Sequence, residues 1–113
     1  MRKSDKKTEK TLIAALKEAC EQLLEEVEGF NWLTHFCDYS NFPASLSIVC
    51  VFDTNEHLTR MLQTDEGDGL RTVLKQRLEL AGIAVRDIKA HTHFDTEEAC
   101  QIEHNGQWKH RFS

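Results

Sequence analysis

The spacing of apolar residues changes at Gly29, and this change constrains the fold more than any other feature of the sequence. Before it, apolar residues recur every three or four positions, as on one face of a helix, at Leu12, Leu16, Ala19, Leu23 and Val27. After it, apolar and polar residues alternate, as in a half-buried strand. The pattern therefore predicts an amphipathic helix over about 5–28 that stops at Gly29, followed by β-structure.

Two strands and a hairpin loop are expected next. Residues 30–38 alternate and would place Phe30, Trp32, Thr34 and Phe36 on one face. Residues 46–52 are β-branched and apolar, which favours a central strand. The segment 39–45 contains the only proline, Pro43, and is typical of a hairpin loop.

The second half of the chain predicts two helices, a strand and a further helix. The helices are expected over about 54–63 and 70–81, separated by the glycine-containing segment 64–69. A third strand is expected over about 83–94, and a short acidic helix over about 95–104. Two similar segments, Phe-Asp-Thr-Asn-Glu at 52–56 and Phe-Asp-Thr-Glu-Glu at 94–98, precede helices and are expected to cap them with Asp53 and Asp95.

This order, α-β-β-α-α-β-α, predicts an α+β two-layer sandwich with a three-stranded sheet and helices packed mainly on one face. A chain of 113 residues fits one domain, 1–113. Within it we expect a basic N-terminal arm over about 1–8 and a short C-terminal helix and tail over about 95–113.

Composition and short motifs exclude several classes of function. The longest apolar runs are five residues, which excludes a membrane span, and the basic N-terminus lacks the apolar stretch of a secretory signal, so we expect a cytoplasmic protein. The four cysteines form no Cys-x-x-Cys motif and are expected to be reduced. No nucleophile elbow, phosphate loop, dinucleotide fingerprint or zinc-protease helix is present, so we expect neither an enzyme nor a cofactor.

Aromatic residues are concentrated around the predicted hairpin, at Phe30, Trp32, Phe36, Tyr39 and Phe42. They have two interpretations. They either form the hydrophobic face of a hairpin that packs on the long helix, or an exposed patch that anchors a protein partner. The acidic segment with Asp95, Glu97, Glu98 and Glu103 is a second possible protein-binding surface.

A basic set in the second half of the chain is the strongest candidate for contacts with nucleic acid. A net charge of -5 disfavours general binding to polyanions, but a local basic face is compatible with it. The alternative is a solvated helix face beside an open sheet. The residues are Arg71, Lys75, Arg77, Arg86, Lys89, His91 and His93.

Four residues form a weaker candidate for a metal site: His91, His93, Cys100 and His104. Zinc accepts imidazole and thiolate ligands, but these residues have no recognised spacing. The acidic neighbours of Cys100 should raise its thiol pKa, which argues against a nucleophilic role.

Several stretches together resemble a family of short proteobacterial proteins whose members are often labelled Fis-family transcriptional regulators. They include Gly-Phe-Asn-Trp-Leu-Thr-His at 29–35, Ile-Val-Cys-Val-Phe-Asp-Thr at 48–54 and His-Phe-Asp-Thr-Glu-Glu-Ala-Cys at 93–100. The label implies regulation of transcription. A Fis-type regulator ends in a basic helix-turn-helix, whereas residues 95–103 predict an acidic helix, so no functional residue is transferred.

The predicted order over about 5–94 also resembles type II KH-like domains, such as small ribosome-maturation factors. This resemblance implies nucleic-acid binding on a Gly-x-x-Gly loop between paired helices. Here residues 65–69 read Asp-Glu-Gly-Asp-Gly, and their three carboxylates would repel a phosphate.

The sequence thus favours a non-enzymatic binding or regulatory module with a macromolecular partner, a protein being favoured over RNA or DNA. The alternative is a nucleic-acid-binding or ribosome-associated regulator, and the second alternative is a metal-binding protein.

Overall fold

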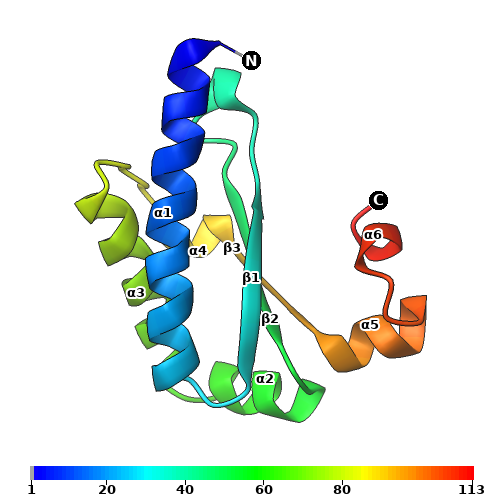
Figure 1. Cartoon of the computed structure of the whole chain (residues 1–113). Helices are drawn as coiled ribbons and strands as arrows, with labels where there is room; N and C mark the ends of the chain where they lie inside the picture. Colours follow the sequence, from blue (N-terminus) through cyan, green and yellow to red (C-terminus); the bar gives the residue numbers. More distant parts are fainter. Residues whose placement is uncertain (1) are drawn as a thin grey trace.

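The major elements follow the predicted order α-β-β-α-α-β-α in the computed structural model of the chain, which describes residues 2–113 (Figure 1). The helices are α1 (Lys3–Glu26), α2 (Asn55–Leu62), α3 (Glu66–Leu80) and α5 (Glu97–His104). The strands are β1 (Phe30–Phe36), β2 (Ser47–Phe52) and β3 (Thr92–Thr96). Three short helical segments complete the chain: η1 (Tyr39–Asn41), α4 (Ile88–His91) and α6 (Trp108–Arg111).

The sheet has the order β1-β2-β3, with β1 antiparallel and β3 parallel to β2. Helices α1 and α3 lie on one side of it, whereas α5 and α6 lie on the other (Figure 1). The α+β sandwich with helices mainly on one face is therefore confirmed. We call the sheet face that is turned away from α1 and α3 the outer face.

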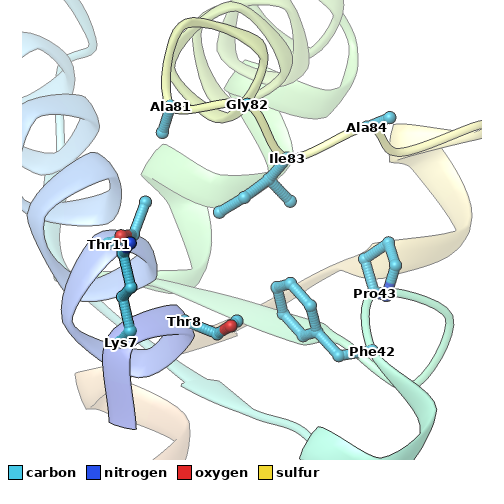
Figure 2. A pocket seen from close by; sticks show the side chains of 9 residues that line it. All are labelled: Lys7, Thr8, Thr11, Phe42, Pro43, Ala81, Gly82, Ile83 and Ala84. Atoms are coloured by element: carbon cyan, nitrogen blue, oxygen red, sulfur yellow. The ribbon is translucent and has the colours of Figure 1, made fainter. Parts of the chain in front are cut away.

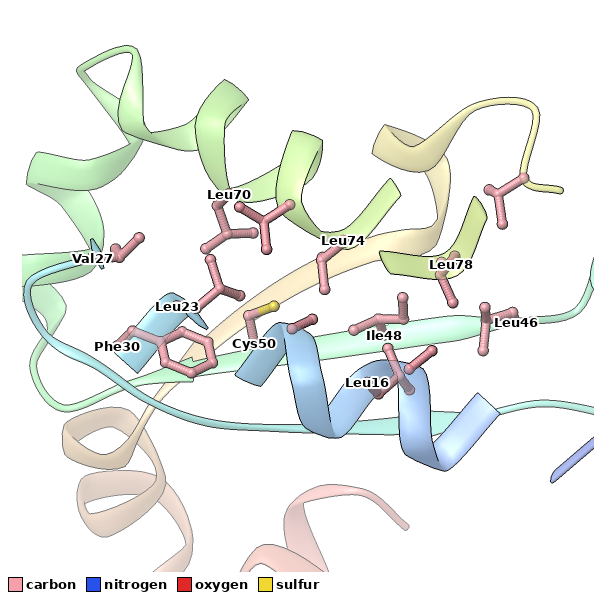
Figure 3. Close-up of a cluster of buried hydrophobic side chains, with 14 of the residues drawn as sticks. Leu16, Leu23, Val27, Phe30, Leu46, Ile48, Cys50, Leu70, Leu74 and Leu78 are labelled. Atoms are coloured by element: carbon pink, nitrogen blue, oxygen red, sulfur yellow. The ribbon is translucent and has the colours of Figure 1, made fainter. Parts of the chain in front are cut away.

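The hydrophobic core fills the space between the sheet and the two long helices (Figure 3). Its centre is made of fully buried side chains from α1, β2 and α3, among them Leu23, Cys50 and Leu74. Phe52 is also fully buried and contacts the rings of Phe30 and Phe94 edge to face, with centroids 5.9 and 6.4 Å away. The predicted helical stripe on α1 is the face that enters this core.

A β-bulge near the start of β1 changes the predicted alternation. The ladder pairs Phe30 with Phe52 but Trp32 with Val51, so Asn31 has no partner across the strand pair. Because one residue is skipped, Phe30 enters the core together with Leu33, while Trp32 faces the other side. The prediction that Phe30 shares a face with Trp32 and Phe36 is therefore wrong.

The third strand is shorter than predicted. Residues 92–96 pair with residues 48–52 of β2, and the predicted residues before Thr92 do not join the ladder. Residues 88–91 form the helical turn α4, in which the Thr92 hydroxyl donates to the Ile88 carbonyl at 2.7 Å. Ile83 and Val85 are buried in the core without joining the sheet. The predicted strand over 83–94 was wrong because apolar alternation there reflects core contact in a connecting loop.

Helix α3 begins earlier than predicted, at Glu66 instead of Leu70. Its first turn contains Gly67, which is buried, and a Cβ at that position would lie 3.5 Å from the Met61 sulfur. Gly67 and Gly69 therefore lie inside the first turn of α3, with Gly67 beside Met61 of α2, instead of separating the two helices.

The basic N-terminal residues form the first turns of α1, since that helix begins at Lys3. The predicted arm over about 1–8 is thus helical from residue 3, and Met1 lies outside the described residues. Within 2–113, no helix combines the length and the apolar character needed to cross a membrane.

Candidate functional site

The structure distributes the five predicted aromatic residues over three places. Phe30 is in the core. Trp32 and Phe36 lie on the outer face. Tyr39 and Phe42 stack on each other at the end of the hairpin, with centroids 5.9 Å apart. The aromatic residues of the hairpin therefore do not form one surface.

Instead, Trp32 and Phe36 join two aromatic residues from the C-terminal tail. Trp32 meets Trp108 edge to face at 4.9 Å, Trp108 lies 5.3 Å from Phe112, and Phe112 meets Phe36 at 5.2 Å. The result is a continuous row of four rings, which we call the aromatic row. Its Phe36 and Phe112 end is open, with exposed fractions of 46% and 36%.

Polar contacts fix the tryptophan end of this row. The Glu97 carboxylate accepts hydrogen bonds from both indole groups, from Trp32 at 2.5 Å and from Trp108 at 3.2 Å. A carboxylate that satisfies two indole donors determines the orientation of both rings. Glu97 belongs to the first turn of α5, so the row is tied to the helix that follows β3.

Arg111 holds the tail against the end of β3. Its guanidinium donates to both oxygens of Asp95, at 2.5 and 2.8 Å, and to Glu103 at 2.5 Å. These carboxylates raise its pKa, and both side chains of the Arg111–Asp95 pair are mostly buried. Bidentate geometry of this kind gives the contact a defined orientation. The predicted acidic helix is thus partly neutralised by a residue of its own tail.

Beyond the aromatic row, the outer face remains partly uncovered. The register of the sheet places Trp32, Val51 and Asp95 in one row across the strands, beneath the tail residues. The next row contains Thr34, Val49 and His93, of which Thr34 and Val49 are half-buried and His93 is exposed. The open aromatic pair therefore borders an uncharged part of the sheet beside one histidine.

The two repeated segments lie side by side at the ends of the parallel strands β2 and β3. Thr54 and Thr96 are the N-caps, accepting hydrogen bonds from the amides of His57 and Ala99. The predicted caps, Asp53 and Asp95, were wrong, because each aspartate accepts from the following threonine amide.

Both aspartates also contact a basic side chain: Asp95 contacts Arg111, and Asp53 contacts His57 at 2.7 Å. The hydrogen bond to the Asp53 carboxylate is the main cause that raises the pKa of His57. Burial opposes the change in Asp53, but bonds from His57 and Thr54 lower the pKa of its carboxyl. Both carboxylates are therefore engaged in contacts within the fold.

Three of the predicted basic residues gather in a groove of about 380 Å³ between α3 and α4: Arg71, Lys75 and Lys89. Asp68 and Glu79 line the same groove. The Arg71 guanidinium lies 5.6 Å from the centroid of Phe94 and 3.4 Å from Asp68. Among residues 2–113, its Nε is a buried donor without a hydrogen-bond partner.

The other predicted basic residues lie elsewhere. Arg77 turns to α1, where it donates to Gln22 at 3.1 Å and lies 3.8 Å from Glu18. The His91 ring contacts the Leu46 carbonyl at 2.6 Å, and Arg86 is exposed in the loop before α4. His93 lies on the outer face, because side chains alternate along β3 and its neighbour Phe94 packs against the core. The basic set is therefore divided by the sheet.

The four residues of the weak metal candidate are also separated. In the described part of the chain, no three His, Cys, Asp or Glu side chains are arranged to hold a metal ion. Cys100 is buried in α5, and His104 contacts Arg111 at 3.2 Å. The pKa of Cys100 is raised, as predicted, although burial is the largest cause, ahead of its acidic neighbours. All four cysteines are free thiols.

A further cavity of about 470 Å³ lies between the start of α1, the hairpin loop and the loop after α3 (Figure 2). Phe42, Pro43 and Ile83 supply much of its apolar lining, and Lys7 lies at its edge. It has few polar groups to orient a small ligand.

No protein family matches the chain by sequence, and no curated protein or solved structure is significantly similar to it.

Proposed function

We propose that this chain is a non-enzymatic module that binds a protein partner through the outer face of its sheet. The observation that carries the proposal is the open end of the aromatic row. Phe36 and Phe112 are exposed by 46% and 36%, and they are held 5.2 Å apart by contacts that exist before any partner arrives. Pre-organised aromatic side chains lose little entropy on binding and are frequent anchors of protein interfaces.

The chemistry around this pair indicates the kind of segment that it accepts. Thr34 and Val49 continue the surface with small uncharged side chains, and Arg111 compensates the carboxylates of Asp95 and Glu103. The expected contact on the partner is an apolar segment flanked by polar groups. A partner held mainly in this way stays bound when salt is added, because screening weakens charged contacts and not apolar ones.

Co-purification from cell extract tests this proposal. Tagged wild-type chain is compared with Phe36→Ala and Phe112→Ala, and with Leu80→Ala as a matched control. Leu80 is an equally apolar side chain, exposed by 81% on α3 and therefore on the helical side. The proposal predicts one protein that is retained at 0.5 M salt by wild type and Leu80→Ala, and lost from both phenylalanine variants. Equal retention by all four chains contradicts it.

A second candidate function, binding of single-stranded RNA or duplex DNA, is supported by the groove between α3 and α4. Arg71, Lys75 and Lys89 line it, and the buried Nε of Arg71 has no partner among the described residues. Parallel strands joined through two helices, as in β2-α2-α3-β3, also fit the proposed likeness to type II KH-like domains. Asp68 and Glu79 reduce the positive potential of the groove, so this function ranks second.

An amide NMR titration with short single-stranded RNA and duplex DNA separates the two functions. Phosphate contacts predict shifts near Arg71, Lys75 and Lys89 that weaken steeply from low to physiological salt. Protein binding as the only function predicts no localised shifts at either salt concentration.

A further inference from the structure

We propose that two copies of this chain associate about a two-fold axis through the side of the molecule formed by α1 and the free edge of β1. We call this surface the α1–β1 side, and its central residues are Ile13, Lys17, Glu21, Leu24, Leu33 and His35. It is separate from the outer face, so the proposal goes beyond the protein-binding function.

The first observation is an apolar groove between α1 and β1. Its volume is about 350 Å³, and Ile13, Leu16 and Leu33 supply apolar lining. Ile13 and Leu24 are exposed by 48% and 52%, although the core-facing stripe of the same helix is buried. With Lys17 and Cys20 between them, they follow the 4-3-4 spacing of a helix–helix contact. Ile13 and Leu24 are therefore apolar positions of α1 that the core leaves exposed, whereas Cys20 between them packs partly against the core.

The second observation is the free edge of β1, which has a neighbour only on its β2 side. Successive backbone amides of a strand alternate between its two sides, so every second residue of β1 directs its N–H and C=O groups to this free side. Such an edge is available for pairing with another strand.

The third observation identifies the occupant as a second copy. Along the exposed side of α1, basic residues predominate first, at Lys6, Lys10 and Lys17, with Glu9 among them, and acidic residues follow at Glu21 and Glu25. Within 2–113, neither Lys17 nor Glu21 has an ion-pair partner, although both are exposed. Two such helices side by side and antiparallel bring the basic half of each next to the acidic half of the other.

A two-fold axis beside Thr34 satisfies all three features together. Strands β1 then pair antiparallel, with Leu33 opposite His35 of the partner subunit. The groove residues place Lys17 and Glu21 of α1 above these positions, so Lys17 lies beside Glu21 of the partner subunit. An isologous contact forms every such pair twice, which makes the surface self-complementary. The two sheets would join into one sheet of six strands.

Sedimentation equilibrium of the purified full chain at low and physiological salt tests this dimer. Wild type and the exposed control Leu80→Ala are expected to dimerise with equal affinity. Lys17→Glu and Glu21→Lys each replace two attractive pairs with two repulsive ones, and each should weaken self-association by about tenfold or more. Thermal unfolding confirms that both exposed substitutions leave the fold intact.

Two further samples make the test specific to this arrangement. The double variant Lys17→Glu/Glu21→Lys restores opposite charges across the axis and should dimerise again. An equimolar mixture of the two single variants should form heterodimers, because positions 17 and 21 are then both acidic in one subunit and both basic in the other. A monomeric wild type at 0.5 mM would overturn the proposal, and so would dimerisation that ignores all of these charge changes. Neither result bears on partner capture by Phe36 and Phe112.

Discussion

Gly29 connects the end of α1 to the start of β1 under two constraints. Its φ is +85°, in the left-handed region, and an added Cβ would lie 2.5 Å from Cβ of His57. Gly82 has a similar φ of +79° but nothing within 4 Å of an added Cβ. The pair therefore separates the backbone effect from the steric effect.

We predict that Gly82→Ala lowers the free energy of unfolding by about 1–2 kcal/mol, the usual cost of a left-handed alanine. Gly29→Ala should lower it by about 3 kcal/mol or more, because the clash with His57 adds to that cost. Urea unfolding of both variants measures the difference. Equal losses would show that the His57 side chain moves aside without lowering the free energy of unfolding.

His57 gives the stability of the fold a dependence on pH. The hydrogen bond to Asp53 is the main cause that raises its pKa, burial opposes it, and Glu28 at 3.5 Å adds to the increase, while Arg60 reduces it. A raised pKa means that the folded state binds the proton more tightly than the unfolded chain. The stabilisation is therefore complete below the unfolded value near 6.5 and is lost as the pH rises through the folded value.

We predict that the free energy of unfolding of the wild type falls over this range, from just below pH 6.5 upward, relative to that of His57→Gln. Urea titrations of both proteins at several pH values measure the difference. A difference that stays constant across this range would rule out a stabilising His57–Asp53 ion pair.

Among the elements, α2 and α5 begin with the same cap in different surroundings. Thr54 and Thr96 both accept a hydrogen bond from a helix amide, at 3.1 and 2.9 Å. Thr96 is also fully buried, and its hydroxyl donates to Asn55 at 2.5 Å, which connects the two helix starts.

We predict that Thr54→Ala costs about 1 kcal/mol of stability, as for an ordinary cap. Thr96→Ala should cost about 2–3 kcal/mol, because it also leaves a buried polar contact unmade. Calorimetry of the two variants, with serine at each position as the cap-retaining control, checks the order. The reverse order would contradict the hydrogen-bond pattern described here.

The attachment of α6 depends on Arg111. Removing it leaves the mostly buried Asp95 carboxylate without its two guanidinium bonds. We predict that Arg111→Met lowers stability by about 2 kcal/mol and frees Trp108 from Trp32 and Glu97. Because Trp32 and Trp108 are the only tryptophans, fluorescence emission should shift to the red below the unfolding transition. An unchanged spectrum would show that the aromatic contacts hold the tail alone.

How far the sequence predicts these elements depends on the type of signal. Periodicity located α1, β2 and α2 to within a few residues, because an apolar stripe or a β-branched run indicates only one type of secondary structure. The start of α3 was missed because Gly67 and Gly69 resemble helix breakers, although both lie in the first turn of the helix. The third strand was overextended because Ile83 and Val85 alternate without pairing.

At the scale of the whole molecule, the candidate site could be predicted only in part. Trp32 and Phe36 were identified because aromatic residues are concentrated around the predicted hairpin. Their ring partners Trp108 and Phe112 lie more than seventy positions later in the sequence. No local pattern signals that the tail returns to β1. The short basic segment Lys109–Arg111 follows an acidic helix and was available as a clue, yet the pairing of Arg111 with Asp95 depends on the tertiary fold.

The central claim is that the outer face of the sheet binds the protein partner, and site-specific photo-crosslinking in living cells tests it most directly. The photoreactive residue p-benzoylphenylalanine replaces Phe36, Phe112 or, as a control, Leu80 in otherwise unchanged chains. The account predicts one discrete adduct with another protein from positions 36 and 112 and none from position 80. Adducts only from position 80, or none from any position in a folded and expressed chain, would contradict it.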